Sequence, residues 1–220
     1  ARFINQDGFI ITGDAAQYNL ENEDLDMGDD WVAYHAGEEV PYDCGSCHTT
    51  GYSLSGNQDN LSGLIGTWAE EGVQCEECHG PGSQHVNHPM SFGMEVVRDS
   101  AACSDCHSRG ANQDLAVADG FIQHHDTYGD LFQGKHAVLD CVDCHNPHTG
   151  VVQLAQADEA TTVVACENCH FEQDRVQNVD SHEKLGVDCI DCHMPNLIQN
   201  AVADASINSG DVRTHMVSID

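Results

Sequence analysis

Six copies of the pattern Cys-x-x-Cys-His dominate this sequence of 220 residues and use all of its 12 cysteines. Motifs 1 to 6, numbered along the chain, are Cys44-Cys47-His48, Cys75-Cys78-His79, Cys103-Cys106-His107, Cys141-Cys144-His145, Cys166-Cys169-His170 and Cys189-Cys192-His193. An even number of cysteines in an exported chain would ordinarily suggest disulfides. Here the repeated pattern leaves no cysteine over for a disulfide, so the order of residues within each copy decides their chemistry.

The repeated pattern is the attachment signature of c-type haem. The two sulfurs form thioethers with the haem vinyl groups, and the imidazole of the next residue binds the iron as proximal ligand. A zinc ribbon also uses pairs of Cys-x-x-Cys, but it makes no demand on the residue after the second cysteine. Histidine fills that place in all six copies, although only 15 of the 220 residues are histidine. The sequence therefore predicts six covalently bound haem c groups.

The spacing of the motifs predicts the fold class. First cysteines of successive motifs lie 31, 28, 38, 25 and 23 residues apart. About 37 residues of protein accompany each haem, which is near the size at which a chain needs metals or crosslinks to fold. We therefore expect a mostly irregular and α structure with little β, in which short helices and loops wrap around a chain of six haems. Haems so close along the chain are expected to exchange electrons rapidly.

Three segments are expected along the chain. Residues 1–43 form an acidic N-terminal segment without haem motifs, with a short strand over residues 9–12. Residues 44–195 form the hexahaem domain, and residues 196–220 form a C-terminal tail that packs on the haem domain. The acidic run 21–30 is interpreted as a solvated face, with calcium binding as the alternative. It lacks the regular Asp spacing and the glycine of an EF-hand loop.

The net charge of −30, from 7 basic and 37 acidic residues, excludes several classes of partner. A nucleic-acid binder needs clustered Lys and Arg, and an anionic membrane surface would repel this chain. No apolar run approaches the roughly 18 residues of a membrane-spanning helix. The sequence begins at Ala1 without a methionine, which we interpret as the mature form of an exported protein. We expect an extracellular location, with the periplasm as the alternative.

Nine histidines outside the motifs are available for the second axial position of six irons. They are His35, His85, His88, His124, His125, His136, His148, His182 and His215. Because the supply exceeds the demand, every iron can bind two imidazoles. The expected distal ligands are His85, His124, His125, His136, His148, His182 and His215, whereas His35 and His88 are weaker candidates. Methionine ligation is the alternative, but Met194 directly follows proximal His193 and points the wrong way for that haem.

Local context supports several of these candidates. His148 follows a proline-bent turn after motif 4, which directs its ring toward a neighbouring haem. His124 and His125 are adjacent, so in an extended segment their side chains point to opposite faces and can reach two irons. His136 and His182 precede motifs 4 and 6 by five and seven residues.

Two imidazoles on every iron would favour electron transfer over catalysis. Such irons have no open position for a substrate, and their potentials are expected to be low because excess carboxylates stabilise the ferric state. An oxidoreductase with one open haem is the alternative. Enzymes of that kind often use a variant motif, but all six motifs here are of the same kind. Lys135 and Lys184 are the only lysines, and neither follows a cysteine.

Several stretches of sequence around and between the motifs are also distinctive. They are Cys44 to Tyr52 (CGSCHTTGY), Gly72 to Cys75 (GVQC), Cys78 to His85 (CHGPGSQH), Phe121 to His125 (FIQHH), Cys141 to His148 (CVDCHNPH), Cys192 to Pro195 (CHMP) and Asp211 to His215 (DVRTH). From about residue 42 to 216 the series resembles multihaem cytochromes of the extracellular nanowire type, which metal-reducing bacteria and some archaea make.

The resemblance implies a filament. Members of that group polymerise head to tail, a heterologous contact that does not close, and one axial histidine is commonly donated by the adjacent subunit. On that basis the partners are copies of the chain itself, with His35 as a natural donor, and redox proteins or extracellular acceptors such as metal oxides. A monomeric periplasmic electron shuttle would use the same haem ligation and is the alternative function.

Overall fold

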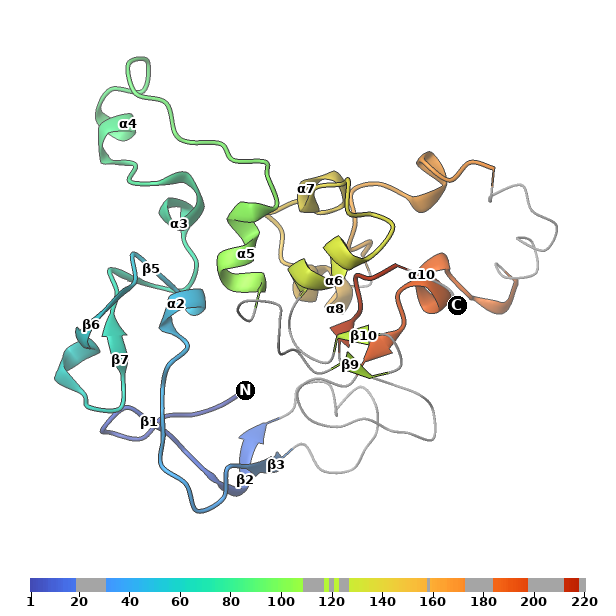
Figure 1. Ribbon diagram of the computed structural model, residues 1–220. Coiled ribbons are helices and arrows are strands. Elements are labelled where there is room, and N and C mark those ends of the chain that lie inside the picture. The colour runs from blue at the N-terminus through green and yellow to red at the C-terminus, as the bar shows by residue number, and fades with distance from the viewer. Residues whose placement is uncertain are drawn as a thin grey trace. The chain divides into compact units, whose positions relative to one another are not determined.

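The computed structural model describes residues 1–18, 31–108, 117–118, 121–122, 127–157, 159–172, 184–197 and 212–217. The chain divides into two compact units, Ala1–Val97 and Arg98–Asp220, whose elements are labelled in Figure 1. Unit 1 contains motifs 1 and 2, and unit 2 contains motifs 3 to 6. The boundary between the units thus lies inside the segment 44–195 that the sequence groups together.

Unit 1 is built largely from short antiparallel strand pairs. They are β1 (Phe9–Ile10) with β4 (Val40–Pro41), β2 (Gly13–Tyr18) with β3 (Trp31–Tyr34), β5 (Thr49–Thr50) with β8 (Glu70–Glu71), and β6 (Ser53–Asn57) with β7 (Ile65–Thr67). Strand β1 confirms the strand expected near residue 9. The start of the chain packs on the segment after motif 1, because the Gly63 N–H donates to the Asp7 carbonyl at 2.8 Å and the Tyr42 N–H donates to the Gly63 carbonyl at 2.7 Å.

Helices in both units are short. Six of them carry the motifs: α2 (Gly45–His48), α3 (Cys75–His79), α5 (Ala101–His107), α7 (Cys141–Cys144), the 3₁₀ turn η2 (Cys166–Asn168) and α10 (Cys189–His193). The others are η1 (Gln58–Asn60), α4 (Ser83–Asn87), α6 (Thr127–Gln133) and α8 (Val151–Gln156). In the described ranges no helix has the length and apolarity needed to cross a membrane.

Unit 2 adds two small strand pairs. Strand β9 (Val117–Ala118) pairs with β10 (Phe121–Ile122), and β11 (Asn196–Leu197) pairs with β12 (Val212–Arg213). The short helices and loops expected from the motif spacing are confirmed. Strands are more frequent than expected, with twelve in the described ranges, but each belongs to a two-stranded pair. These pairs satisfy the backbone polar groups of the segments between motifs, which little other structure covers.

The apolar core of the polypeptide is very small. In the part of the chain that the structure describes, the buried hydrophobic residues are Ile10, Ala16 and Leu64, all in unit 1. Large apolar side chains such as Met90 and Val138 are instead at least 90% exposed. Because burial of apolar surface is the main favourable term in folding, this core is too small for 220 residues. That deficit supports the prediction that haems supply the core.

Candidate haem sites

The motifs fold as single helical turns. In motifs 1, 4 and 5 the N–H groups of His48, His145 and His170 donate to the carbonyl oxygen of the first cysteine at 3.0, 2.8 and 2.9 Å. Residues three and four apart share one face of such a turn, so both sulfurs and the imidazole leave the same side. No two of the twelve cysteines, which all lie in the described residues, form a disulfide. The turn therefore suits attachment of one flat group through two thioethers and one metal bond.

Acidic residues begin two of these turns. Asp140 caps α7 and Asp188 caps α10, and each forms a capping box with an aspartate three residues later. The cap N–H donates to Asp143 Oδ2 in one case and to Asp191 Oδ2 in the other, both at 2.9 Å. Such boxes satisfy N–H groups that a helix start otherwise leaves without partners. The bond from the Asp188 N–H lowers the pKa of Asp191, and Arg213 adds to this effect.

A buried hydroxyl links motif 3 to motif 4. Ser100, the fully buried residue before α5, donates from its N–H and its Oγ to Asp140 Oδ1 at 2.9 and 3.0 Å. Its Oγ also accepts the N–H of Cys141 at 2.9 Å. In unit 1 the buried Thr50 does the same between motifs 1 and 2, because its Oγ1 accepts the N–H of Gln74 at 2.8 Å. Each hydroxyl holds two successive motif turns together.

Replacement of Ser100 by alanine is expected to destabilise the haem-loaded protein. The change removes one bond from Asp140 and leaves the N–H of Cys141 without its acceptor. A buried unsatisfied group of this kind costs about 1–3 kcal/mol, measured as a loss of unfolding free energy in urea. The matched control is Ser104→Ala, because the Ser104 hydroxyl bonds only within α5, to the Ala101 carbonyl at 2.6 Å. Equal effects of the two substitutions would contradict the linking role.

Two candidate distal histidines lie beside motif histidines in unit 2. The rings of His145 and His215 have centroids 6.0 Å apart with an interplanar angle of 46°. Those of His136 and His170 are 5.7 Å apart at 71°. Histidine–metal bonds are about 2.0–2.1 Å long, so two imidazoles on opposite sides of one iron have centroids roughly 6 Å apart. Both ring pairs fit a haem iron with two histidine ligands.

Backbone carbonyl groups orient four of the candidate ligand rings through Nδ1. The pairs are His79 with the Glu95 carbonyl (2.6 Å), His85 with Phe92 (2.7 Å), His145 with Thr161 (3.0 Å) and His215 with Arg213 (3.2 Å). A ring that donates its Nδ1–H to a carbonyl presents an unprotonated Nε2. That is the tautomer an iron ligand requires, and the carbonyl also fixes the plane of the ring.

Burial keeps both distal rings neutral. Burial and the adjacent His145 lower the pKa of His215 to about 4. Burial also lowers the pKa of His136, and neighbouring His170 and His193 add to this effect. Among the described residues no hydrogen-bond partner lies within reach of the buried Nδ1 of His136. Since neutral imidazole is the form that binds metal, both rings are available at neutral pH.

Motifs 3 to 6 adjoin one another in chain order. His107 of motif 3 is near enough to His215 to contribute to the lowering of its pKa. The N–H of Val163, just before motif 5, donates to the carbonyl of Cys144 in motif 4 at 2.8 Å. Burial raises the pKa of Cys166 in motif 5, and the neighbouring Cys189 of motif 6 adds to it. Each motif of unit 2 therefore lies beside the next.

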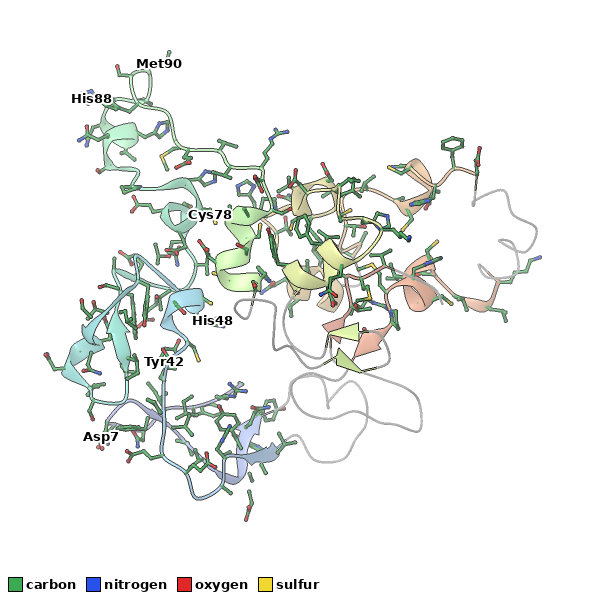
Figure 2. All side chains as sticks on the ribbon, in the orientation of Figure 1. Asp7, Tyr42, His48, Cys78, His88 and Met90 are labelled. Atoms are coloured by element: carbon green, nitrogen blue, oxygen red, sulfur yellow. The ribbon has the colours of Figure 1, made fainter. Side chains whose placement is uncertain are left out.

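The described residues include three other candidates, His35, His88 and His148. His35 binds Glu38 through Nδ1 at 2.9 Å, and 49% of its side-chain surface is exposed. The backbone N–H of His148 donates to Asn146 Oδ1 at 3.0 Å. Figure 2 shows His88 beside the exposed Met90, at the end of the loop beyond α4 and away from Cys78 of motif 2.

The remaining three candidates, His124, His125 and His182, lie outside the described residues. Distal ligation stays a prediction for these three residues and for every other candidate histidine.

The residues that join successive motif turns could not be predicted from the sequence. Ser100 and Asp140 belong to residue types that are common in this chain, and no short pattern marks Ser100. The pattern Asp-Cys-x-Asp-Cys-His at motifs 4 and 6 could have predicted the caps, because Asp-x-x-Asp across a helix start is a capping box.

The zinc alternative would need four ligands at one point, and no group of three or more His, Cys, Asp or Glu converges in this way in the described part of the chain.

Comparisons with known proteins agree with the motifs. A family model described as "Cytochrome c554 and c-prime" matches residues 16–80. Multiheme cytochrome MtrA of Shewanella baltica is 30% identical over 122 residues, which cover 52% of this chain and 32% of MtrA. C-type polyheme cytochrome OmcC of Geobacter sulfurreducens is 34% identical over 92 residues, which cover 40% of this chain and 12% of OmcC. The matches thus span a third or less of these relatives.

The fold is also similar to a known structure. The crystal structure of outer cell wall cytochrome OcwA matches with a TM-score of 0.52 and 19% sequence identity, covering 86% of this chain and 59% of OcwA. Together with the attachment motifs, the sequence matches support a multihaem c-type cytochrome. Both sequence relatives are named as cytochromes with several haems, and OmcC is named as c-type.

Proposed function

We propose that this cytochrome carries electrons through six haems whose irons are each bound by two histidines. The observation that carries the proposal is the placement of two spare imidazoles roughly 6 Å from motif histidines, at 6.0 and 5.7 Å. When bound, haem c supplies a one-electron iron couple. The polypeptide contributes the attachment cysteines, fills both axial positions and sets the charge around them.

The ring pairs support two of the six proposed ligand sets. His145 and His215 would bind the iron at motif 4, and His170 and His136 would bind the iron at motif 5. Motifs 1, 2, 3 and 6 then need four distal ligands: three come from among His85, His124, His125, His148 and His182, and the fourth is the histidine that an adjacent subunit donates in the filament proposed below. His85 is supported by its Nδ1 bond to the Phe92 carbonyl, which leaves Nε2 for iron.

The contacts between motifs support a path in chain order through unit 2. Motif 3 is joined to motif 4 through Ser100 and Asp140, and motif 4 to motif 5 through Val163 and Cys144. Electrons then pass from motif 3 through motifs 4 and 5 to motif 6, or in reverse. The excess of 30 negative charges favours the ferric state along this path, so the potentials are low.

The proposal extends to a filament outside the cell. Copies of the chain join head to tail, and His35 is donated to an iron of the adjacent subunit. Its exposed ring, with Nδ1 held by Glu38 and Nε2 left for a metal, supports that role. Electrons pass to redox proteins or to extracellular acceptors such as metal oxides. A monomeric periplasmic shuttle is the second candidate, because the same ligand sets serve it equally.

Electron microscopy of the native protein tests the filament, and substitution of His35 tests the donor. Wild-type protein is expected to form filaments, and His35→Ala is expected to leave mostly discrete particles with one high-spin haem per chain. His88→Ala is the matched control, since His88 is also exposed and outside the motifs. Discrete wild-type monomers in the periplasmic fraction would favour the shuttle. Filaments formed equally well by His35→Ala would exclude His35 as the donor.

A further inference from the structure

The segment 212–217, which contains His215, packs against α6 of unit 2. Its contact residue on that helix is Asp130, whose side chain is 3% exposed. The Thr214 hydroxyl donates to Asp130 Oδ2 at 2.6 Å, and the backbone N–H of His215 donates to the same oxygen at 3.0 Å. The N–H of Met216 donates to Thr214 Oγ1 at 3.2 Å. One buried carboxyl oxygen therefore binds the Thr214 side chain and the backbone of the residue that follows it.

The same segment is fixed at two further points. A methyl group at Gly134, just after α6, would overlap the carbonyl oxygen of Met216, so glycine is required for this close approach. On the other side of Thr214, the Arg213 guanidinium donates to the carbonyls of Ile190 and Met194 at 3.1 and 3.2 Å. The residues that flank His215 are thus anchored to α6 and to the turn of motif 6.

Burial of a carboxylate needs compensation. A buried charge is expensive unless hydrogen bonds satisfy it, and bonds to a charged acceptor are roughly twice as strong as neutral ones. Because water does not compete for a buried acceptor, Asp130 Oδ2 holds Thr214 and His215 more firmly than an exposed acceptor would. Firm placement matters because His215 is 70 residues from its ring partner His145 in the sequence. Residues close to either histidine in the sequence therefore cannot by themselves fix the distance between the two rings.

We infer that Asp130 is a positioning residue that, through Thr214 and the His215 backbone, holds the His215 ring in axial contact with the haem of motif 4. The inference rests on the proposed pairing of His215 with His145. Asp130 does not itself touch the iron. It determines how often the His215 ring detaches from the iron, and therefore how readily an external ligand binds that iron instead.

Carbon monoxide binding to the reduced, haem-loaded protein tests this role. His215→Ala is expected to bind one carbon monoxide per chain and to show one high-spin haem. In Asp130→Asn and Thr214→Val the ring detaches more often, so the apparent affinity for carbon monoxide at one haem rises roughly tenfold or more. Thr214→Ser keeps the hydroxyl and is expected to behave as wild type. Haem content and thermal unfolding of each variant show whether it has folded.

The outcomes separate the two claims. If His215→Ala gains a carbon monoxide site but Asp130→Asn and Thr214→Val keep wild-type affinity, the positioning role is wrong and the ligand pairing stands. If His215→Ala keeps the wild-type spectrum, the pairing itself is wrong. If Asp130→Asn fails to fold, Thr214→Val and Gly134→Ala test the positioning role instead. Both substitutions disturb the segment 212–217 and leave Asp130 itself unchanged. Lower thermal stability in those variants without carbon monoxide binding would overturn the role.

Discussion

A chain produced without haem attachment is expected to remain largely unfolded. The buried hydrophobic residues of the described polypeptide are Ile10, Ala16 and Leu64, and the net charge of −30 opposes compaction. Without the apolar surface of six haems, conformational entropy exceeds what this core supplies. Expression in cells that lack cytochrome c maturation is expected to give a far-ultraviolet circular dichroism spectrum of unfolded chain and rapid proteolysis. The same sequence from maturing cells is expected to resist protease.

Removal of a single haem provides a graded control. Cys166→Ser with Cys169→Ser deletes the attachment at motif 5, which lies in unit 2. Protease sensitivity is then expected to increase within residues 98–220, while residues 1–97 remain protected. A folded, protease-resistant chain without any haem would contradict the conclusion that haems form the core.

Replacement of His136 by alanine is expected to open one iron. The His136 ring lies 5.7 Å from that of His170, and the substitution removes the second imidazole from motif 5. One of six haems is then expected to become high-spin and to bind carbon monoxide at a concentration where the native chain shows no uptake. Because motif 5 lies between motifs 4 and 6, electron passage along unit 2 is expected to slow as well. Electronic spectra and carbon monoxide titration measure the first effect, and stopped-flow reduction measures the second.

His148→Ala extends this test within the same unit. His148 is also a candidate ligand outside the motifs, so its substitution is expected to open a different iron, giving one high-spin haem with an unchanged spectrum at motif 5. His88→Ala is the control expected to alter neither. A wild-type spectrum for His136→Ala would exclude His136 as a ligand, and the ring pair would then be a packing contact.

The sequence predicted what depends on short distances along the chain. Cys-x-x-Cys-His places two sulfurs and an imidazole at positions i, i+3 and i+4, which one helical turn brings to one face. The strand near Phe9 was expected from its apolar run. The capping aspartates at motifs 4 and 6 could have been predicted for the same reason but were not. Each of these features is decided by neighbouring residues.

The pairing of ligands could not be predicted in the same way. His215 and His136 were both candidates, but the choice of iron depends on contacts between distant segments. Thr214 reaches Asp130 across 84 residues, and Gly134 is needed only because Met216 approaches it. Strand pairs such as β5 with β8 were missed because two residues are too few to show an alternating pattern.

The central claim is that every iron in this cytochrome is closed by two imidazoles, so that the protein conducts electrons and does not catalyse. Low-temperature electron paramagnetic resonance of the fully oxidised native protein, with iron and haem counted per chain, tests it most directly. The account predicts six haems per chain, all low-spin with two histidine ligands, and no carbon monoxide uptake after reduction. A high-spin ferric signal from the intact native protein, matched by carbon monoxide binding, would show an open iron and contradict the account.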